Sequence, residues 1–167
     1  MLSPENLIFD KRKIQYCTKR IAYQILESNI NNKEIFLVGI ADNGCFFAKE
    51  IEKILSKITR KKIKNLKLEV DKKRPGNEIS LDFNVKNLEN KSVVIVDDVL
   101  NTGLVLSHSL KFLLSVHIEQ IKIAVLVNRE HNKFPVKADF KGISLSTSVN
   151  ETVKVNLKGK HVGIYLV

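Results

Sequence analysis

Apolar residues recur at helical spacing in two long segments of the chain. The first covers residues 10–29 and the second runs from 45 to about 58. In both segments the apolar side chains fall three or four positions apart, so they would share one face of a helix. A third helical segment is expected from 103 to about 116. The pattern therefore predicts three helices.

Shorter apolar runs between and after these helices predict strands. Three nearly continuous runs are typical of strands buried on both faces of a parallel sheet. They cover residues 34–39, 91–97 and 121–127. Two further runs alternate apolar and polar residues, and three short alternating segments close the chain. These cover 63–70 and 79–85, followed by segments around 143–145, 153–157 and 162–167.

Strands and helices alternate through the middle of the chain. This order predicts an α/β fold with a mostly parallel central sheet flanked by helices. A length of 167 residues suits one domain over positions 1–167. Because ligands of such sheets bind at the carboxyl ends of the strands, four loops are expected to carry function. They are loops 39–44, 71–79, 97–105 and 128–135.

Composition excludes several classes of protein. With 44% hydrophobic and 28% charged residues, the chain has the composition of a folded domain rather than a disordered tail. The first twelve residues lack the apolar core of a signal peptide, and no apolar run is long enough to span a bilayer. Cys17 and Cys45 are too few for a disulfide framework or a closed zinc site, and Cys17 is expected to pack in the first helix. We therefore expect a cytoplasmic protein without membrane contact.

The chain is strongly basic, with 28 Lys and Arg against 18 Asp and Glu, a formal charge of +10. The excess is local, because residues 57–74 hold nine basic and two acidic residues. Such a charge favours an anionic partner: nucleic acid, a phosphorylated small molecule or an acidic surface. The charge alone does not choose among them.

The segment that carries chemistry covers residues 93–103. A buried strand runs into the adjacent carboxylates Asp97 and Asp98, followed by a loop with Thr102 and Gly103 and then by a helix. The loop N–H groups and the N-terminus of the helix suit a phosphate, whereas the carboxylates suit the vicinal hydroxyls of a ribose. The segment therefore favours a ribose 5-phosphate site. A helix cap at Asp98 with an ordinary turn fits the same spacing.

Residues 93–103 closely resemble the phosphoribosyl-pyrophosphate motif of type I phosphoribosyltransferases, in which two acidic residues are followed shortly by Thr-Gly. A longer ordered set of matches is similar to the PyrR type of this family, which combines regulation of the pyrimidine operon with uracil phosphoribosyltransferase activity. The matching positions are 20–22, 37–40, 44, 48–49, 96–100, 124–127, 129, 131, 135, 138–140 and 142. The resemblance implies the type I fold, with a small C-terminal hood of short strands.

Carried over residue by residue, the resemblance implies roles at the sugar and its phosphates. Asp97 and Asp98 would bind the 2′- and 3′-hydroxyls of the ribose as the catalytic pair. The residues around the 5′-phosphate would be Asn101, Thr102, Gly103 and Leu104. A loop presenting backbone N–H groups to pyrophosphate would comprise Gly39, Ile40, Ala41, Asp42, Asn43 and Gly44.

The same resemblance implies the rest of the site and the reaction. A mobile cover loop at 71–78 would bring in Lys72, Lys73 and Arg74. The base would lie near the hood, at Arg129, His131, Lys137, Asp139 and Phe140. The protein would transfer ribose 5-phosphate from phosphoribosyl pyrophosphate to a nucleobase, with uracil and UMP as the first expectation, and release pyrophosphate. Mg²⁺ would act as cofactor through substrate oxygens rather than through assigned protein ligands. A homo-oligomer, dimer or larger, is also implied.

Three positions depart from the pattern of the family. Val105 stands where a Ser or Thr usually binds the 5′-phosphate. Residues 41–43 are neutral to acidic where PyrR-type proteins usually carry Lys or Arg, and the cover loop lacks the usual Tyr-Arg element. An alternative function is therefore a weakly catalytic or non-catalytic nucleotide sensor that binds RNA.

Residues at the RNA face of the PyrR type match only in part. Lys19, Arg20, His131 and Lys137 would serve such a face. Other residues stand where the regulators tend to carry His, Arg or Lys, namely Tyr23, Ser28, Asn132 and Ile143. Because RNA affinity scales with the number of phosphate contacts, RNA binding is the less expected of the two functions.

Overall fold

A six-stranded sheet forms the centre of the computed structural model, which describes residues 4–148 and 151–167. The strand order is β4-β3-β2-β5-β6-β7, with every neighbouring pair parallel except β3 and β4. The bounds are β2 Glu34–Ile40, β3 Lys62–Glu69, β4 Ser80–Leu81, β5 Ser92–Leu100, β6 Gln120–Asn128 and β7 Phe140–Ser144. The α/β prediction with a mostly parallel sheet is thus confirmed.

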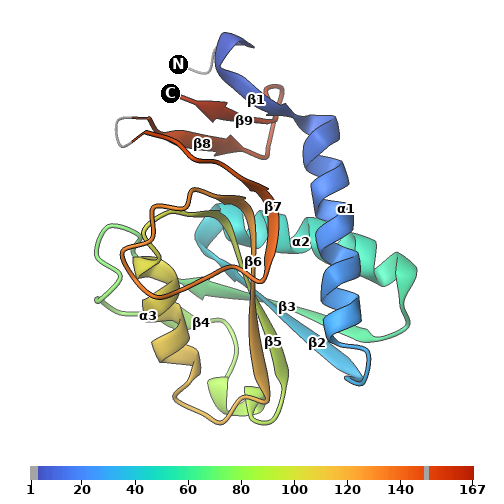
Figure 1. Ribbon diagram of the computed structural model, residues 1–167. Coiled ribbons are helices and arrows are strands. Elements are labelled where there is room, and N and C mark those ends of the chain that lie inside the picture. The colour runs from blue at the N-terminus through green and yellow to red at the C-terminus, as the bar shows by residue number, and fades with distance from the viewer. Residues whose placement is uncertain (1–3, 149–150) are drawn as a thin grey trace.

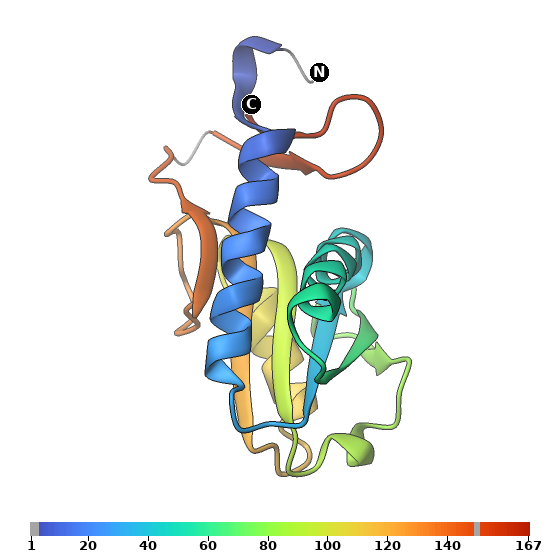
Figure 2. The ribbon, with the colours of Figure 1, turned by 90° about the vertical axis from the view of Figure 1, so that its right-hand side faces the viewer.

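Helices cover both faces of this sheet (Figure 2). On one face lie α1 Lys11–Ser28 and α2 Ala41–Ile58, and on the other lies α3 Leu104–Leu113. Side chains alternate across a strand, so within β5 Val94 and Val96 pack under α1 and α2, whereas Val93 and Ile95 face the α3 side. These strands are apolar on both faces because both faces are buried.

A second sheet of three antiparallel strands stands at one end of the molecule, and we call it the hood (Figure 1). Its order is β1-β9-β8, formed by β1 Leu7–Asp10, β8 Val153–Asn156 and β9 Gly163–Leu166. Two short 3-10 helices complete the described elements, at Pro4–Asn6 and Val85–Leu88. The hood therefore joins the N-terminal strand to two strands of the C-terminal end.

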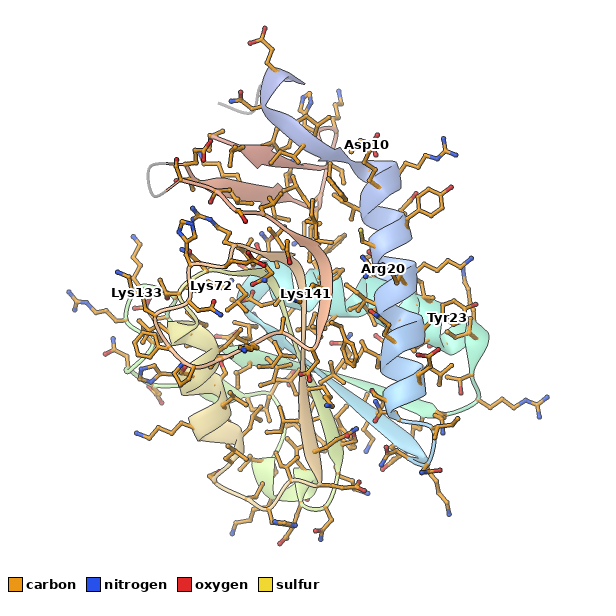
Figure 3. All side chains as sticks on the ribbon, viewed as in Figure 1. Asp10, Arg20, Tyr23, Lys72, Lys133 and Lys141 are labelled. Carbon is orange, nitrogen blue, oxygen red and sulfur yellow. The ribbon has the colours of Figure 1, made fainter. Side chains whose placement is uncertain are left out.

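Polar contacts fix α1 at its start and along its length. Asp10 caps the helix, because its Oδ1 accepts a hydrogen bond of 2.8 Å from the backbone N–H of Lys13. Further along, the Arg20 guanidinium donates to the carbonyls of Lys141 and Gly142 at 3.0 and 2.6 Å, and Figure 3 shows it beside this stretch of β7. Cys17 lies buried in the same seam, as predicted. These contacts cover a sheet edge that would otherwise expose unpaired carbonyls.

The structure corrects several expected boundaries. The alternating run at 79–85 forms only the two-residue β4, followed by a 3-10 helix. Of the three closing segments, the first forms β7 and joins the central sheet rather than the hood. The strand β1 was not predicted, because four residues are too short for a period of two to stand out. No helix in the described part of the chain is long and apolar enough to cross a membrane.

The order of the strands creates a crevice between β2 and β5. From β2 the chain passes through α2 to β3 on one side, and from β5 it passes through α3 to β6 on the other. The two connections diverge, so they leave the carboxyl ends of β2 and β5 uncovered between them. Open α/β sheets bind their ligands at such a point.

The close approach of α2 to β2 gives a stability prediction. A Cβ added at Gly39 would lie 2.5 Å from the Cα of Cys45, so the backbone would have to move. We expect Gly39→Ala to lower the free energy of unfolding by about 1–3 kcal/mol in urea denaturation. The control is Gly76→Ala, whose Cβ meets only the His108 ring at 3.5 Å. Equal stability of the two variants would contradict this packing.

Candidate active site

A cavity of about 360 Å³ lies at the carboxyl end of β5. Its walls come from β5, the loop after it, the first turn of α3 and the hood. The lining residues are Lys72, Asp97, Asp98, Val99, Leu100, Asn101, Thr102, Gly103, Leu104, Val105, Leu106, Arg129, Thr152 and Val153. The cavity thus includes the acidic pair and the whole predicted phosphate loop.

The two adjacent carboxylates are buried at this cavity. Asp97 and Asp98 are 3% and 8% exposed and belong to β5 itself, not to the loop after it. Lys72 places its Nζ 2.9 Å from Asp97 Oδ1 and 3.2 Å from Asp98 Oδ1. In the view of Figure 3, Lys72 lies between α3 and the hood. One ammonium group therefore compensates both carboxyl groups.

Burial and hydrogen bonds separate the two carboxyl groups electrostatically. Burial, reinforced by the charge of Asp98, raises the pKa of Asp97 to about 7. Burial acts in the same direction on Asp98, but the charge of Lys72 and the hydrogen bonds to this carboxylate outweigh it and lower its pKa. The pKa of Lys72 is raised by both carboxylates, against the effect of its own burial. Asp98 is therefore the permanent anion of the pair at neutral pH.

The loop after β5 forms a cradle at the N-terminus of α3. Gly103 precedes the helix with φ of 85°, a left-handed conformation that favours glycine. The Thr102 hydroxyl accepts a hydrogen bond of 3.3 Å from the N–H of Leu104. The backbone carbonyl of Thr102 accepts from the N–H groups of Lys133 and Phe134, so the loop after β6 holds the cradle from behind. Asp98 does not cap α3, which removes the simple capping interpretation.

The predicted pyrophosphate loop is largely regular structure. Gly39 and Ile40 end β2, and residues 41–44 form the first turn of α2. Ala41 begins this turn with φ of 47°, in the left-handed region that a non-glycine residue seldom adopts. The turn packs directly on β5, because a Cβ added at Gly44 would lie 2.6 Å from the carbonyl oxygen of Val96.

A second cleft, of about 570 Å³, opens beside this turn. Four of its eight lining residues are acidic, and Lys67 is its basic residue. The lining residues are Ala41, Asp42, Lys67, Glu69, Val70, Asp71, Glu78 and Ser80. Because negative side chains repel phosphates, this cleft does not favour a pyrophosphate on electrostatic grounds.

The cover loop is anchored at two points. Lys72 binds the acidic pair, and Pro75 is buried in a small pocket against α3. Lys73 and Arg74 between them are exposed. The structure thus places one of the three predicted cations in the cavity, on the two carboxylates.

Of the residues expected near the base, only Arg129 is among the residues that line the cavity. Arg129 lines the cavity, but its guanidinium is engaged with Thr147 Oγ1 at 2.9 Å and with the carbonyl of Glu151 at 2.7 Å. His131 Nε2 lies 2.7 Å from the carbonyl oxygen of Thr147. Both side chains therefore hold the segment that leads into β8.

Lys137, Asp139 and Phe140 lie outside the cavity lining. Lys137 is exposed, and Phe140 is buried at the start of β7. Asp139 accepts a 2.8 Å hydrogen bond from the N–H of Ile123 and lies 3.2 Å from Lys122 Nζ. Asp139 and Phe140 thus join the start of β7 to β6.

Some site residues could not be found from the sequence. Thr152 and Val153 line the cavity, but they belong to a short polar segment without a motif. The Asn43 side chain donates to Asp98, whereas sequence reasoning gave this residue a role through its backbone only. These contacts become visible only in the folded structure, where α2 and the hood lie against β5.

Comparisons with known proteins agree with the geometry. A family model described as phosphoribosyl transferase domain matches residues 8–159. A protein named bifunctional protein PyrR from Staphylococcus epidermidis is 37% identical and is matched over 92% of this chain and 93% of its own. A protein of the same name from Leuconostoc mesenteroides is 32% identical over 91% of both chains.

Solved structures show the same fold at lower identity. The hypoxanthine phosphoribosyltransferase of Trypanosoma cruzi superposes with a TM-score of 0.80 at 16% identity, covering 96% of this chain and 95% of its own. That of Staphylococcus aureus gives 0.73 at 20% identity, covering 89% and 81%. At these identities the likeness concerns the fold alone. Taken with the family model and the PyrR relatives, it confirms the sequence resemblance: the chain belongs to the phosphoribosyltransferase family and is of the PyrR type.

Proposed function

We propose that this protein is a Mg²⁺-dependent phosphoribosyltransferase that transfers ribose 5-phosphate from phosphoribosyl pyrophosphate to uracil, forming UMP and pyrophosphate. The observation that carries the proposal is the pairing of two buried carboxylates with a glycine-initiated helix across one cavity. The family supports the reaction, and the PyrR relatives support a pyrimidine base.

Asp98 and Asp97 supply the sugar-binding end of the cavity. A carboxylate accepts hydrogen bonds, and the two hydroxyls of a ribose donate them. In the free protein the Lys72 ammonium holds these acceptor positions. Lys72 holds one oxygen of each carboxylate, and a ribose that takes these positions would move the ammonium toward the mouth of the cavity, beside the incoming diphosphate.

The other end of the cavity suits the 5′-phosphate. Residues 101–104 wrap the N-terminus of α3, where backbone N–H groups and the helix dipole favour an anion. Val105 lines this end without a hydroxyl. The missing contact would cost about 1.5–3 kcal/mol relative to a charge-assisted hydrogen bond.

Mg²⁺ fits this site as an ion carried by the substrate. No group of three or more His, Cys, Asp and Glu side chains is placed to hold a metal within residues 4–148 and 151–167. Diphosphate and ribose oxygens are hard donors that Mg²⁺ prefers. When bound, the ion would neutralise part of the charge of the leaving diphosphate.

In the reaction, a bond forms between a ring nitrogen of uracil and C1 of the sugar, while the bond from C1 to the diphosphate oxygen breaks. The electron pair of that bond leaves with pyrophosphate, and the proton of the uracil nitrogen passes to solvent. C1 becomes positively charged in the transition state, so the fixed negative charge of Asp98 stabilises it. A closed cover loop excludes water that would otherwise attack C1.

Activity is tested directly with phosphoribosyl pyrophosphate, Mg²⁺ and uracil, with UMP formation as the measurement. Asp98→Asn removes the permanent charge of the pair and is expected to lower kcat/KM by on the order of 100-fold or more. The matched control is Asp82→Asn, whose carboxylate accepts a hydrogen bond from the N–H of Lys67. If the wild-type chain forms no nucleotide from uracil, xanthine, guanine, hypoxanthine, adenine or orotate, it is not a transferase.

The raised pKa of Asp97 predicts a pH-dependent stability. Its pKa is 3.8 for the free side chain and about 7 in the fold, so the folded chain binds the additional proton between these values. The contribution of Asp97 to stability is therefore fully present below about pH 4 and is lost as pH rises through 7. In urea denaturation, the free energy of unfolding of Asp97→Asn relative to wild type should rise by on the order of 1–4 kcal/mol between pH 4.5 and 8. If the difference in free energy of unfolding between the two proteins does not change with pH, the pKa of Asp97 is not raised by folding.

A second function is favoured by the acidic cleft beside Ala41 together with Val105, since both weaken the binding of phosphates. We propose as the alternative a weakly catalytic nucleotide sensor that binds RNA. The outer face of α1 offers Tyr16 and Tyr23, 62% and 43% exposed, beside Arg12 and Lys19. Bases stack on exposed aromatic rings between basic residues.

The sensor is tested by calorimetry with UMP and by a gel shift with pyrimidine-operon leader RNA. The expected result is UMP binding and a salt-dependent RNA complex that Tyr16→Ala weakens by about 1–3 kcal/mol. UMP binding without any RNA complex would leave the transferase as the function.

A further inference from the structure

Asn43 lies where three parts of the site meet. It belongs to the first turn of α2 and is partly buried. Its Nδ2 donates to Asp98 Oδ2 at 2.8 Å and to the carbonyl of Val155 at 3.3 Å. Val155 belongs to β8, the hood strand whose Val153 lines the cavity. One amide group thus joins α2, the acidic pair and the hood.

The Asp98 carboxylate divides its two oxygens between different partners. Lys72 binds Oδ1 from the cover loop, and Asn43 binds Oδ2 from α2. The first partner sits on the cover loop, at the oxygen that a ribose hydroxyl would take. The second partner sits on a helix and can stay, so it keeps the carboxylate plane fixed while Oδ1 exchanges the ammonium for a hydroxyl.

The backbone around Asn43 packs closely on β5. Ala41 has a left-handed φ of 47°, and Gly44 brings the turn against the Val96 carbonyl. The first turn of α2 thus packs directly on β5, and Asn43 projects from this packed element. Sites supported by such packed elements hold their geometry more closely than sites on loops.

We propose that Asn43 is a positioning residue of the transfer reaction: it orients the Asp98 carboxylate toward the ribose hydroxyls and holds β8 over the cavity. The role rests on the proposed function for its sugar-binding part, whereas the tie to β8 stands without it. The side chain of Asn43 thereby acts at the sugar, not at the pyrophosphate that the family resemblance implied for its backbone. It also links the hood strand β8 to the carboxylate at the sugar-binding end.

Two variants of Asn43 distinguish the effect of its hydrogen-bond donor from the effect of its size and shape. Asn43→Ala removes the amide, and Asn43→Asp keeps its shape but replaces the donor with a negative charge facing Asp98. Asn65→Ala is the control, because Asn65 Nδ2 makes the same kind of bond to a carboxylate, Glu52, elsewhere in the fold. Three measurements are made on each full-length protein: ribose 5-phosphate affinity by calorimetry, the ¹³C shift of the Asp98 carboxyl carbon, and amide exchange of β8 without ligand.

Asn43→Ala is expected to weaken ribose 5-phosphate binding about tenfold, move the Asp98 carboxyl resonance and speed exchange in β8. Asn43→Asp should be worse than Asn43→Ala in affinity and exchange, and Asn65→Ala should match wild type. The proposal is overturned if Asn43→Asp behaves like wild type, or if the Asp98 resonance and β8 exchange stay unchanged in both variants. If wild type neither binds ribose 5-phosphate nor forms a nucleotide, the proposed function fails, and exchange in β8 with the Asp98 resonance still decides the role of Asn43.

Discussion

Two neighbouring carboxylates lie buried at the end of the central strand β5, and burying charge is unfavourable unless partners compensate it. The partners come from separate elements. Lys72 reaches in from the cover loop, and Asn43 reaches in from α2. Asn43 also contacts the hood through Val155. The acidic pair thus ties the loop, the helix and the hood to one point of the sheet.

This arrangement links stability to ligand binding. The Lys72 ammonium occupies one oxygen of each carboxylate, which are acceptor atoms that the ribose hydroxyls would use under the proposed function. A ribose in this position would replace the contacts of Lys72 with the carboxylates. Its net free energy of binding would therefore be its own contact free energy minus that of the Lys72 contacts. The raised pKa of Asp97 has the same origin. A buried carboxyl group beside a second carboxylate, with one cation shared between them, takes up a proton more readily than a free one. Burying two carboxyl groups lowers the stability of the fold but leaves their oxygens in place for a ligand. Catalytic sites commonly combine these two effects.

The sequence predicted the fold well where patterns are long and regular. The helical period of α1 and the apolar runs of β2, β5 and β6 each determine one element, and their order determines a parallel sheet. Residues 93–103 also pointed correctly to a cavity at the carboxyl end of β5. Short elements such as β1 and β4 lacked enough residues to show a period.

The contacts within the site were harder to predict, because they join residues far apart in the chain. Nothing in the sequence places Lys72 on Asp97, since a run of three cations fits solvent equally well. Nor does it place Asn43 between Asp98 and Val155, which are 55 and 112 positions away. Arg129 was expected near the base, but its Nε and Nη2 groups donate to hydroxyl and carbonyl oxygens of the segment before β8. Each of these contacts depends on how the loops fold over the sheet.

A crystal structure of the protein with UMP and Mg²⁺ tests the central claim most directly, which is that the acidic pair and the α3 cradle form a ribose 5-phosphate site. We expect the ribose hydroxyls on Asp97 and Asp98, the phosphate against residues 101–104, and the Lys72 ammonium displaced from the pair. UMP bound elsewhere on the molecule, with Lys72 still on both carboxylates, would contradict it.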